Sequence, residues 1–205
     1  GIVGARTNRI SAEGQQNHAG TTRMPDRRDA GAALRKVAAM LEARAAELAG
    51  PRTVWTIGNM SFDPGAPSIV PGRAEMYWQF RDTDPEILAR FEAMLTETVA
   101  EANAASPCEI GFASNGMTSK PAAMDETLMA ALDAAAERFA PGKHVRMPSG
   151  AGHDAQILAQ AMPSAMMFVP SINGISHHWS EDTKEEDIAV GAQVYVDAVA
   201  RILTA

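Results

Sequence analysis

Residues 73–81 alternate between apolar and polar side chains, and this pattern constrains the fold more tightly than any other stretch. The apolar positions are Ala74, Met76, Trp78 and Phe80. Successive side chains of a strand point to opposite faces, so a period of two predicts a strand with one face against a core and a wetter opposite face. The chain is therefore expected to contain a sheet that other elements cover on one side.

The segments around this strand form an alternating order of strands and helices. In chain order, the sequence predicts a strand at 9–14, a helix from 28 to the Gly-Pro pair at 50–51, a strand at 53–57, the strand at 73–81, a helix that begins at the Asp-Pro pair at 84–85, and a strand at 109–112. This β-α-β-β-α-β order is the ferredoxin-like, or split βαβ, arrangement. We place this domain at residues 5–115 and expect a four-stranded antiparallel sheet with two helices on one face.

Residues 116–205 change in style and read as part of a layered α/β domain. Helices are expected at 125–139, from 150 to about 163, and from about 183 onward, with strands at 144–147 and 165–169. The run at 165–169 is continuously apolar, as in a strand buried on both faces. The last helix is expected to bury a stripe that consists of Ile188, Tyr195, Val199 and Ile202.

Net charge and cysteine content limit the binding partners and the cellular compartment that we expect. The chain has 18 Lys and Arg against 25 Asp and Glu, a net charge of −7. A field of this sign disfavours nonspecific binding to nucleic acid or to anionic membranes. No apolar run is long enough to span a bilayer. Cys108 is the single cysteine, which rules out an intrachain disulfide and fits a reducing compartment, so we expect a cytoplasmic protein.

Three histidines and one arginine are candidates for chemistry. His177 follows the expected buried strand, at the edge where α/β sheets place ligands, and could be a metal ligand or an exposed loop residue. His153 begins a helix, where it could contact an anion or act as a simple cap. Arg81 ends the polar face of the strand and could bind a carboxylate or be a solvated charge. His18 lies in a loop between glycines.

Six motifs occur in a fixed order along the chain. They are Gly-Gln-Gln-Asn-His-Ala-Gly-Thr-Thr (14–22), Arg-Arg-Asp-Ala (27–30), Ile-Val-Pro-Gly (69–72), Gln-Phe-Arg (79–81), Ser-Gly-Ala-Gly-His-Asp-Ala (149–155) and Asn-Gly-Ile-Ser-His (173–177). Together they resemble the hydantoinase/carbamoylase family of dinuclear metal amidohydrolases, within the aminoacylase/carboxypeptidase clan. That family includes N-carbamoyl-L-amino-acid hydrolases, allantoate amidohydrolases and β-ureidopropionases. The resemblance covers essentially all 205 residues.

The resemblance implies a division of labour between two parts of a longer enzyme. Residues 5–115 would be a ferredoxin-like lid that also forms a homodimer, and residues 116–205 the C-terminal part of the catalytic domain. The complete enzyme would hold two divalent metal ions, zinc or manganese, with at most one ligand from this chain. The other ligands and the general base would lie outside it, so the chain alone is expected to be inactive. The substrate would be a small molecule with a carboxylate.

The resemblance also implies roles for particular residues. His177 matches the last metal ligand, and His18 matches the lid histidine that reaches into the partner's site and stabilises the oxyanion. Arg81 matches the arginine that holds the substrate carboxylate, with Gly152 and His153 at the same end of the substrate. Ser68 stands at a substrate-binding position where Asn is usual, and it offers one donor hydroxyl in place of an amide. The chain also departs from the family pattern at Arg23, where Pro is usual, and at His178-Trp179, where Asn-Pro is usual. These departures affect the expected substrate more than the chemistry.

The implied reaction is hydrolysis of a linear amide or ureido C–N bond in an N-carbamoyl amino acid or an allantoate-like compound. Two other functions remain compatible with the residues. One is a non-catalytic lid, dimerisation or ligand-binding fragment. The other is a peptidase or N-acyl-amino-acid hydrolase of the same clan, although the motifs at 149–155 and 173–177 favour the carbamoylase branch.

Overall fold

The computed structural model describes residues 1–204, which divide into two compact units. One unit is Val3–Pro121, and the other consists of Gly1–Ile2 and the chain from Ala122 onward. The first unit therefore extends a few residues beyond each end of the 5–115 segment that the sequence predicts. No helix within residues 1–204 has the length and apolar character that crossing a membrane would require.

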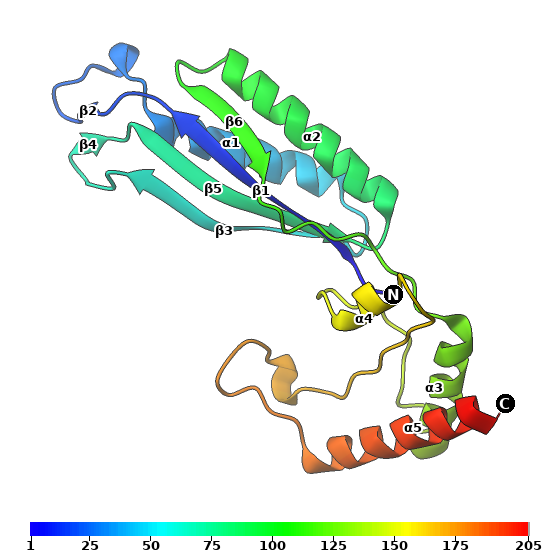
Figure 1. The fold of residues 1–205 in the computed structure, drawn as a ribbon. Coiled ribbons are helices and arrows are strands. Elements are labelled where there is room, and N and C mark those ends of the chain that lie inside the picture. The colour runs from blue at the N-terminus through cyan, green and yellow to red at the C-terminus, as the bar shows by residue number, and fades with distance from the viewer. Residues whose placement is uncertain (205) are drawn as a thin grey trace. The chain divides into compact units, whose positions relative to one another are not determined.

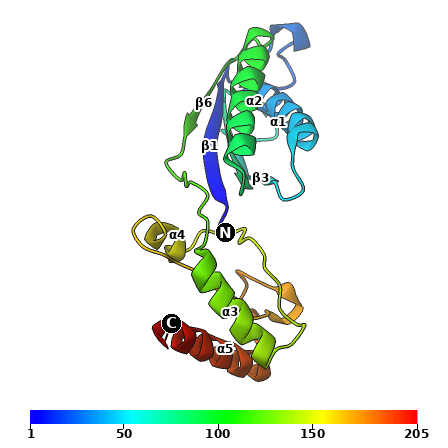
Figure 2. The same ribbon diagram turned by 90° about the vertical axis from the view of Figure 1, so that its right-hand side faces the viewer.

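The first unit contains a four-stranded antiparallel sheet in the order β3-β5-β1-β6 (Figure 1). Its strands are β1 (Gly4–Glu13), β3 (Val54–Asp63), β5 (Arg73–Asp82) and β6 (Glu109–Ser114). The helices α1 (Ala30–Leu48) and α2 (Pro85–Ala104) lie on the same side of it (Figure 2). A short 3-10 turn, η1 (Met24–Asp26), precedes α1. The predicted ferredoxin-like order is confirmed.

The core of this unit lies between the sheet and the two helices. Along β5, the apolar positions Ala74, Met76, Trp78 and Phe80 are at most 1% exposed, while the alternate polar positions are half-buried or exposed. Phe91 of α2 packs against both aromatic rings, with centroids 6.1 Å from Trp78 and 5.2 Å from Phe80. The alternation at 73–81 thus places one face of β5 against the core, as the sequence predicts.

Both helices begin at the aspartates that the sequence places there. The side chain of Asp29 accepts a hydrogen bond from the Ala32 amide at 2.8 Å. Asp84 does the same for the Glu86 amide at 2.8 Å, and Pro85 occupies the first helical turn. These carboxylates satisfy backbone N–H groups that have no partner inside the helix.

Two strands, β1 and β3, are longer than predicted by four or five residues, β5 and β6 are longer by one or two, and one pairing was not predicted at all. β1 begins at Gly4, since its polar first half pairs through the backbone with the end of β5. β3 runs on to Asp63 through a register shift between Ile57 and Asn59, and such a bulge interrupts the alternation from which strands are recognised. The unpredicted pairing joins two-residue strands, β2 (Asn17–His18) and β4 (Ile69–Val70).

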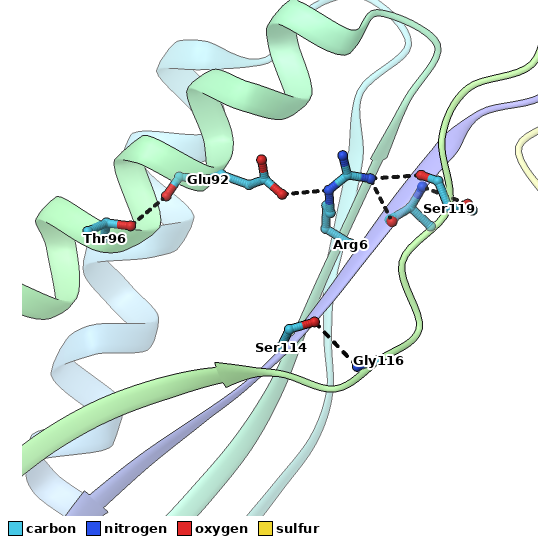
Figure 3. A network of polar contacts seen from close by, with 7 residues as sticks. Arg6, Glu92, Thr96, Ser114, Gly116 and Ser119 are labelled. Carbon is cyan, nitrogen blue, oxygen red and sulfur yellow. Dashed lines mark hydrogen bonds and ion pairs between the residues drawn. The ribbon is translucent and has the colours of Figure 1, made fainter.

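The segment after β6 returns along the start of β1 and closes the unit (Figure 3). The Ser119 amide donates to the Ala5 carbonyl at 3.0 Å, and the Ala5 amide donates to the Ser119 carbonyl at 3.2 Å. Arg6 donates to the Ser119 carbonyl at 2.7 Å and to the Glu92 carboxylate of α2 at 2.5 Å. The entry and exit of the unit are therefore hydrogen-bonded to each other.

The second unit contains helices and loops. Its helices are α3 (Glu126–Phe139), α4 (Asp154–Leu158) and α5 (Glu185–Thr204), with a 3-10 turn, η2 (Ile172–Gly174). Asp125 caps α3 by accepting from the Leu128 amide at 3.0 Å, which confirms the predicted start of this helix. α3 packs against α5 around three fully or nearly buried side chains, Ala135, Val194 and Ala198. Ile2 is also fully buried, and its amide donates to the Ala122 carbonyl.

Several predictions for this unit are wrong. Residues 144–147 and 165–169 form no strand, and Phe168 and Val169 are 52% and 39% exposed. A strand buried on both faces needs strands beside it and layers above and below it, and the described residues of this unit contain no named strand to pair with. The helix expected from 150 to 163 is limited to α4.

The predicted buried stripe of α5 is also wrong. Ile188, Tyr195 and Ile202 are 53%, 59% and 40% exposed, and only Val199 of the stripe is half-buried. The face that packs contains Gly191, Val194 and Ala198. A Cβ at Gly191 would lie 2.5 Å from the Val169 side chain, so glycine allows the 167–169 segment to approach the helix closely. Small residues mark the buried side of α5, and the bulky apolar residues are largely on its open side.

Candidate functional site

The loop that follows β2 fixes the orientation and the tautomer of His18. The His18 Nδ1 atom accepts hydrogen bonds from the Gly20 amide at 3.0 Å and the Thr21 amide at 3.2 Å. A ring nitrogen that accepts carries its lone pair, so the proton of the neutral imidazole is on Nε2. Since His18 is exposed, its Nε2–H group is available as a donor to a ligand.

Further contacts close the loop of residues 18–22, which we call the His18 loop. The His18 carbonyl accepts from the Thr22 amide at 3.1 Å and from the Thr22 hydroxyl at 2.6 Å. The Arg27 guanidinium donates to the Thr22 carbonyl at 3.1 Å and to the Ala19 carbonyl. A Cβ on Gly20 would lie 3.2 Å from the His18 ring, so glycine lets the backbone approach the imidazole.

The structure brings Ser68 next to the His18 loop. In the β2–β4 pair, His18 lies opposite Ile69, and the Ala19 amide donates to the Ser68 carbonyl at 2.9 Å. Ser68 is exposed, so its hydroxyl lies on the same accessible end of the unit as the imidazole. The sequence does not indicate this proximity, because 49 residues lie between His18 and Ser68 and a two-residue pairing has no periodic signal.

Arg81 is held by a chain of hydrogen bonds on the open face of the sheet. Its Nε donates to Gln79 Oε1 at 2.8 Å, and Gln79 Nε2 donates to the hydroxyl of Thr7 on β1 at 2.8 Å. Thr7 is only 4% exposed, which gives the chain a rigid anchor. The motifs do not indicate these contacts of Gln79 and Thr7. The signal for Gln79 was its spacing, because residues two apart on a strand share a face.

His18 and Arg81 lie toward opposite ends of the same sheet. At one end Arg73 pairs with Glu13, just before the His18 loop, and at the other Arg81 pairs with Ala5. The eight steps along β5 from Arg73 to Arg81 span about 27 Å at the usual rise of a strand. Figure 1 shows β2 and β4 beyond the end at which β5 begins. One small substrate therefore cannot contact His18 and Arg81 of the same chain.

In the second unit, His153 pairs with a buried serine. Its Nε2 lies 2.7 Å from the Ser149 hydroxyl, which also contacts the amide and carbonyl of Ala151 at 3.1 and 3.0 Å. Ser149 is 5% exposed, and the His153 ring lies 5.4 Å from that of Phe168. His153 stands at the N-cap of α4 without making a side-chain cap, so the simple-cap interpretation is wrong. Gly152, beside it, is exposed and a Cβ there would make only an ordinary contact.

His177 lies in an exposed loop just after η2. Its backbone has a positive φ of 56°, and its amide donates to the Glu181 carboxylate at 2.8 Å. Within residues 1–204, no three His, Cys, Asp or Glu side chains are placed to hold a metal ion together. The structure therefore places His177 apart from any complete set of ligands in the described chain.

Cys108 is not one of the candidate site residues. It is 3% exposed beside the first residue of β6, and burial raises the pKa of its thiol. A protonated, inaccessible thiol is a poor nucleophile and a poor metal ligand. Its role is packing, as the sequence indicates.

Comparisons with known proteins place these residues in a wider context. The profile of peptidase family M20/M25/M40 matches residues 13–201. The chain is 36% identical to an allantoate amidohydrolase of Escherichia coli (strain K12), over 94% of this chain and 46% of that protein. It is 32% identical to an N-carbamoyl-L-amino-acid amidohydrolase of Rhizobium meliloti, over 91% of this chain and 44% of that protein.

A solved structure shows the same arrangement of the backbone. It is an amidase of the hydantoinase/carbamoylase family from Burkholderia phymatum, with a TM-score of 0.89 and 43% identity over 98% of this chain and 48% of that one. The chain thus spans about half the length of the relatives that it matches.

Proposed function

The chain belongs to peptidase family M20/M25/M40, and from this membership we propose that it supplies the lid and the C-terminal part of the catalytic domain of a C–N hydrolase. The resemblance to hydantoinase/carbamoylase amidases is confirmed by its relatives. The proposed reaction is cleavage of a linear amide or ureido bond in an N-carbamoyl amino acid or an allantoate-like compound. The names of the relatives support this substrate class, since they act on allantoate and on N-carbamoyl-L-amino acids.

The observation that carries the proposal is the fixed donor of His18. Attack on an amide or ureido carbonyl moves negative charge onto its oxygen, and a preorganised donor stabilises that charge. His18 accepts at Nδ1 and therefore offers Nε2–H, the geometry that such a donor needs. Arg81, oriented by Gln79, would bind the substrate carboxylate, with Gly152 and His153 at the same end of the substrate.

A metal site is part of the proposal only for the complete protein. We assign His177 as one ligand of two divalent ions, zinc or manganese. The described residues do not form such a site by themselves, because no suitable cluster surrounds His177. Besides this one metal ligand, the chain's proposed contributions are donation by His18 and binding of the substrate carboxylate by Arg81, with Gly152 and His153 at the same end of the substrate.

The isolated 205-residue chain is expected to retain well under one metal ion per chain. A single imidazole without neighbouring ligands cannot hold zinc or manganese against dialysis, since tight sites use several protein ligands. The measurement is elemental analysis after loading with each metal and exhaustive dialysis. Retention of two ions per chain would show that the ligand argument is wrong.

We propose that the complete protein is a homodimer in which His18 serves the partner's site. The opposite placement of His18 and Arg81 supports this arrangement, because a substrate then contacts His18 of one chain and Arg81 of the other. β3 offers a surface for such a dimer. It is an edge strand of ten residues whose only charge is Asp63 at its end, and long uncharged edges readily pair with another strand. A cytoplasmic location is proposed on the single, free Cys108.

Lysines on β3 are expected to weaken the dimer. Val54 and Thr56 are exposed on this edge strand, and the double variant Val54→Lys/Thr56→Lys would place like charges along the pairing edge. Sedimentation velocity of the chain should show a shift from dimer to monomer. The matched control is Ser114→Lys on β6, the other edge, which should remain dimeric. An unchanged dimer in the β3 variant would refute this interface.

Arg81→Ala in the complete enzyme is expected to raise KM for an N-carbamoyl amino acid about ten- to a hundredfold. This range corresponds to the loss of hydrogen bonds to a charged group. The substrate analogue with a carboxamide in place of the carboxylate should show no such change. Arg81→Lys should recover part of the affinity, because the bidentate fork is lost.

Arg73→Ala is the control for Arg81→Ala, since Arg73 is an exposed arginine on the same strand at the opposite end. Its KM should match that of the unmodified enzyme. An equal rise in KM in both variants would refute the binding role of Arg81. If the unmodified complete enzyme hydrolyses neither N-carbamoyl amino acids nor allantoate-like compounds, the proposed reaction is refuted. That result would favour a non-catalytic lid or binding module.

A further inference from the structure

Arg27 contacts the His18 loop at two points. Its Nε donates to the Thr22 carbonyl at 3.1 Å, and a terminal nitrogen donates to the Ala19 carbonyl. The guanidinium thus joins the carbonyls of residues that lie on both sides of the turn. Arg27 itself is half-buried, two residues before the Asp29 cap of α1. A residue attached to the rigid start of a helix can therefore hold an otherwise exposed loop.

The contacts within the loop explain why such a hold matters. The His18 Nδ1 atom depends on the amides of Gly20 and Thr21, which lie between the two carbonyls that Arg27 binds. If these carbonyls separate, the turn opens and the amides move away from the ring. His18 then loses both the fixed ring orientation and the preference for a proton on Nε2.

The chemistry of the guanidinium suits this task. Its planar donors can reach two carbonyls at once in a fixed geometry, whereas an ammonium group is a point charge on a flexible stem. Within residues 1–204, Arg27 forms no ion pair with a carboxylate at salt-bridge distance. The side chain therefore serves backbone carbonyls of the loop that carries the imidazole.

We propose that Arg27 is a positioning residue for His18: it clamps the carbonyls of Ala19 and Thr22 so that the loop presents the His18 Nε2–H group to the substrate. The clamp itself is a property of the chain. Its consequence for catalysis rests on the proposed function of His18. The two levels can be measured separately.

The first measurement is NMR on the 205-residue chain, without metal or substrate. In the unmodified chain, His18 should show an unprotonated Nδ1 and a protonated Nε2, with slow solvent exchange of the Gly20 and Thr21 amides. Arg27→Met should speed exchange of these amides about tenfold, the factor expected for the loss of one hydrogen bond. The ring-nitrogen shifts should move toward those of free histidine. Arg27→Lys should give intermediate values, because lysine can bind one carbonyl.

The matched control is Arg28→Met. Arg28 is the neighbouring, exposed arginine, and its Nε also donates to a backbone carbonyl, that of Pro107 at 3.0 Å. This variant should leave the His18 loop unchanged. Amide exchange in β1 and β5 reports whether each variant is folded. Unchanged exchange and ring shifts in a folded Arg27→Met chain would overturn the clamp.

The second measurement is kinetics of the complete enzyme. Arg27→Met should lower kcat and leave KM nearly unchanged. The reason is that His18 is proposed to stabilise the transition state and to contribute little to binding of the substrate in the ground state. Arg27→Lys should retain part of the kcat that Arg27→Met loses, and Arg28→Met should leave kcat unchanged. An open loop by NMR with an unchanged kcat would overturn the catalytic role of His18, and with it the functional half of this inference. A mobile loop together with a reduced kcat supports both the clamp by Arg27 and the catalytic role of His18.

Discussion

His18→Ala in the complete enzyme is expected to lower kcat about a hundred- to a thousandfold, the usual cost of removing one oxyanion donor. KM should stay nearly constant, because the interaction forms only as charge develops on the carbonyl oxygen. Steady-state kinetics with an N-carbamoyl amino acid provide the measurement. His144→Ala is the control, since His144 is not among the candidate site residues and its ring lies 3.7 Å from the Glu137 carboxylate. A large rise in KM at constant kcat would assign His18 to ground-state binding instead.

Mixing two inactive variants tests whether His18 acts on its partner. A dimer of one His18→Ala chain and one His177→Ala chain would contain one site with both residues intact. Activity should therefore return to as much as about a quarter of the unmodified value, because random exchange makes half of the dimers mixed and each has one working site. Subunit exchange is verified with differently tagged chains. Full exchange without recovered activity would remove the role of His18 in the partner's site.

Phe91→Ala is expected to lower the free energy of unfolding of the first unit by about 3–5 kcal/mol, the usual cost of truncating a buried phenylalanine. Phe91 is fully buried and is the ring that α2 contributes to the cluster with Trp78 and Phe80. This loss is a large part of the stability of an ordinary domain. Urea denaturation, followed by the fluorescence of the buried Trp78, measures it.

Phe112→Ala is the control for Phe91→Ala, because Phe112 on β6 is 39% exposed. It should cost far less, since much of its surface remains in water in the folded state. Equal losses in the two variants would show that the aromatic cluster is not the centre of this core.

The fold of the first unit was largely predictable because its signals are local. The period of two along 73–81, the aspartates at the two helix starts and the Gly-Pro stop at 50–51 each specify a nearby backbone conformation. Their agreement leaves few topologies. The bulge at Gly58 and the short β2–β4 pair carry no such period, so the strand of 53–57 was predicted too short and the pair was missed.

The second unit was harder to predict, because apolar content does not say what covers it. Residues 165–169 and the bulky face of α5 have the composition of a core, and yet Phe168, Val169 and most of the bulky side chains of α5 are exposed, while 165–167 are only half-buried. Burial depends on neighbours elsewhere in sequence. The packed side of α5 contains Gly191, Val194 and Ala198, and two of these three are small residues that give a weaker signal than leucines would, although close helix packing needs them.

For the candidate site, sequence reasoning supplied the residues and the structure supplied their relations. His18 and Ser68 come together, and His18 and Arg81 are separated by the length of a strand. Each of these residues is held by others: Arg27 holds the His18 loop, and Gln79 with Thr7 holds Arg81. No pattern in the sequence reveals these contacts. Hydrogen bonds between side chains depend on geometry that a residue list does not contain.

The pairing of Ala5 with Ser119 has an evolutionary consequence. The chain enters the first unit beside the point at which it leaves, with mutual hydrogen bonds between the two segments. A module of this kind can be inserted into a host protein, or exchanged for another, while the host's two cut ends stay together. For the same reason the unit Val3–Pro121 could be removed as one module, and a short linker would then be long enough to join the two ends of the remaining chain.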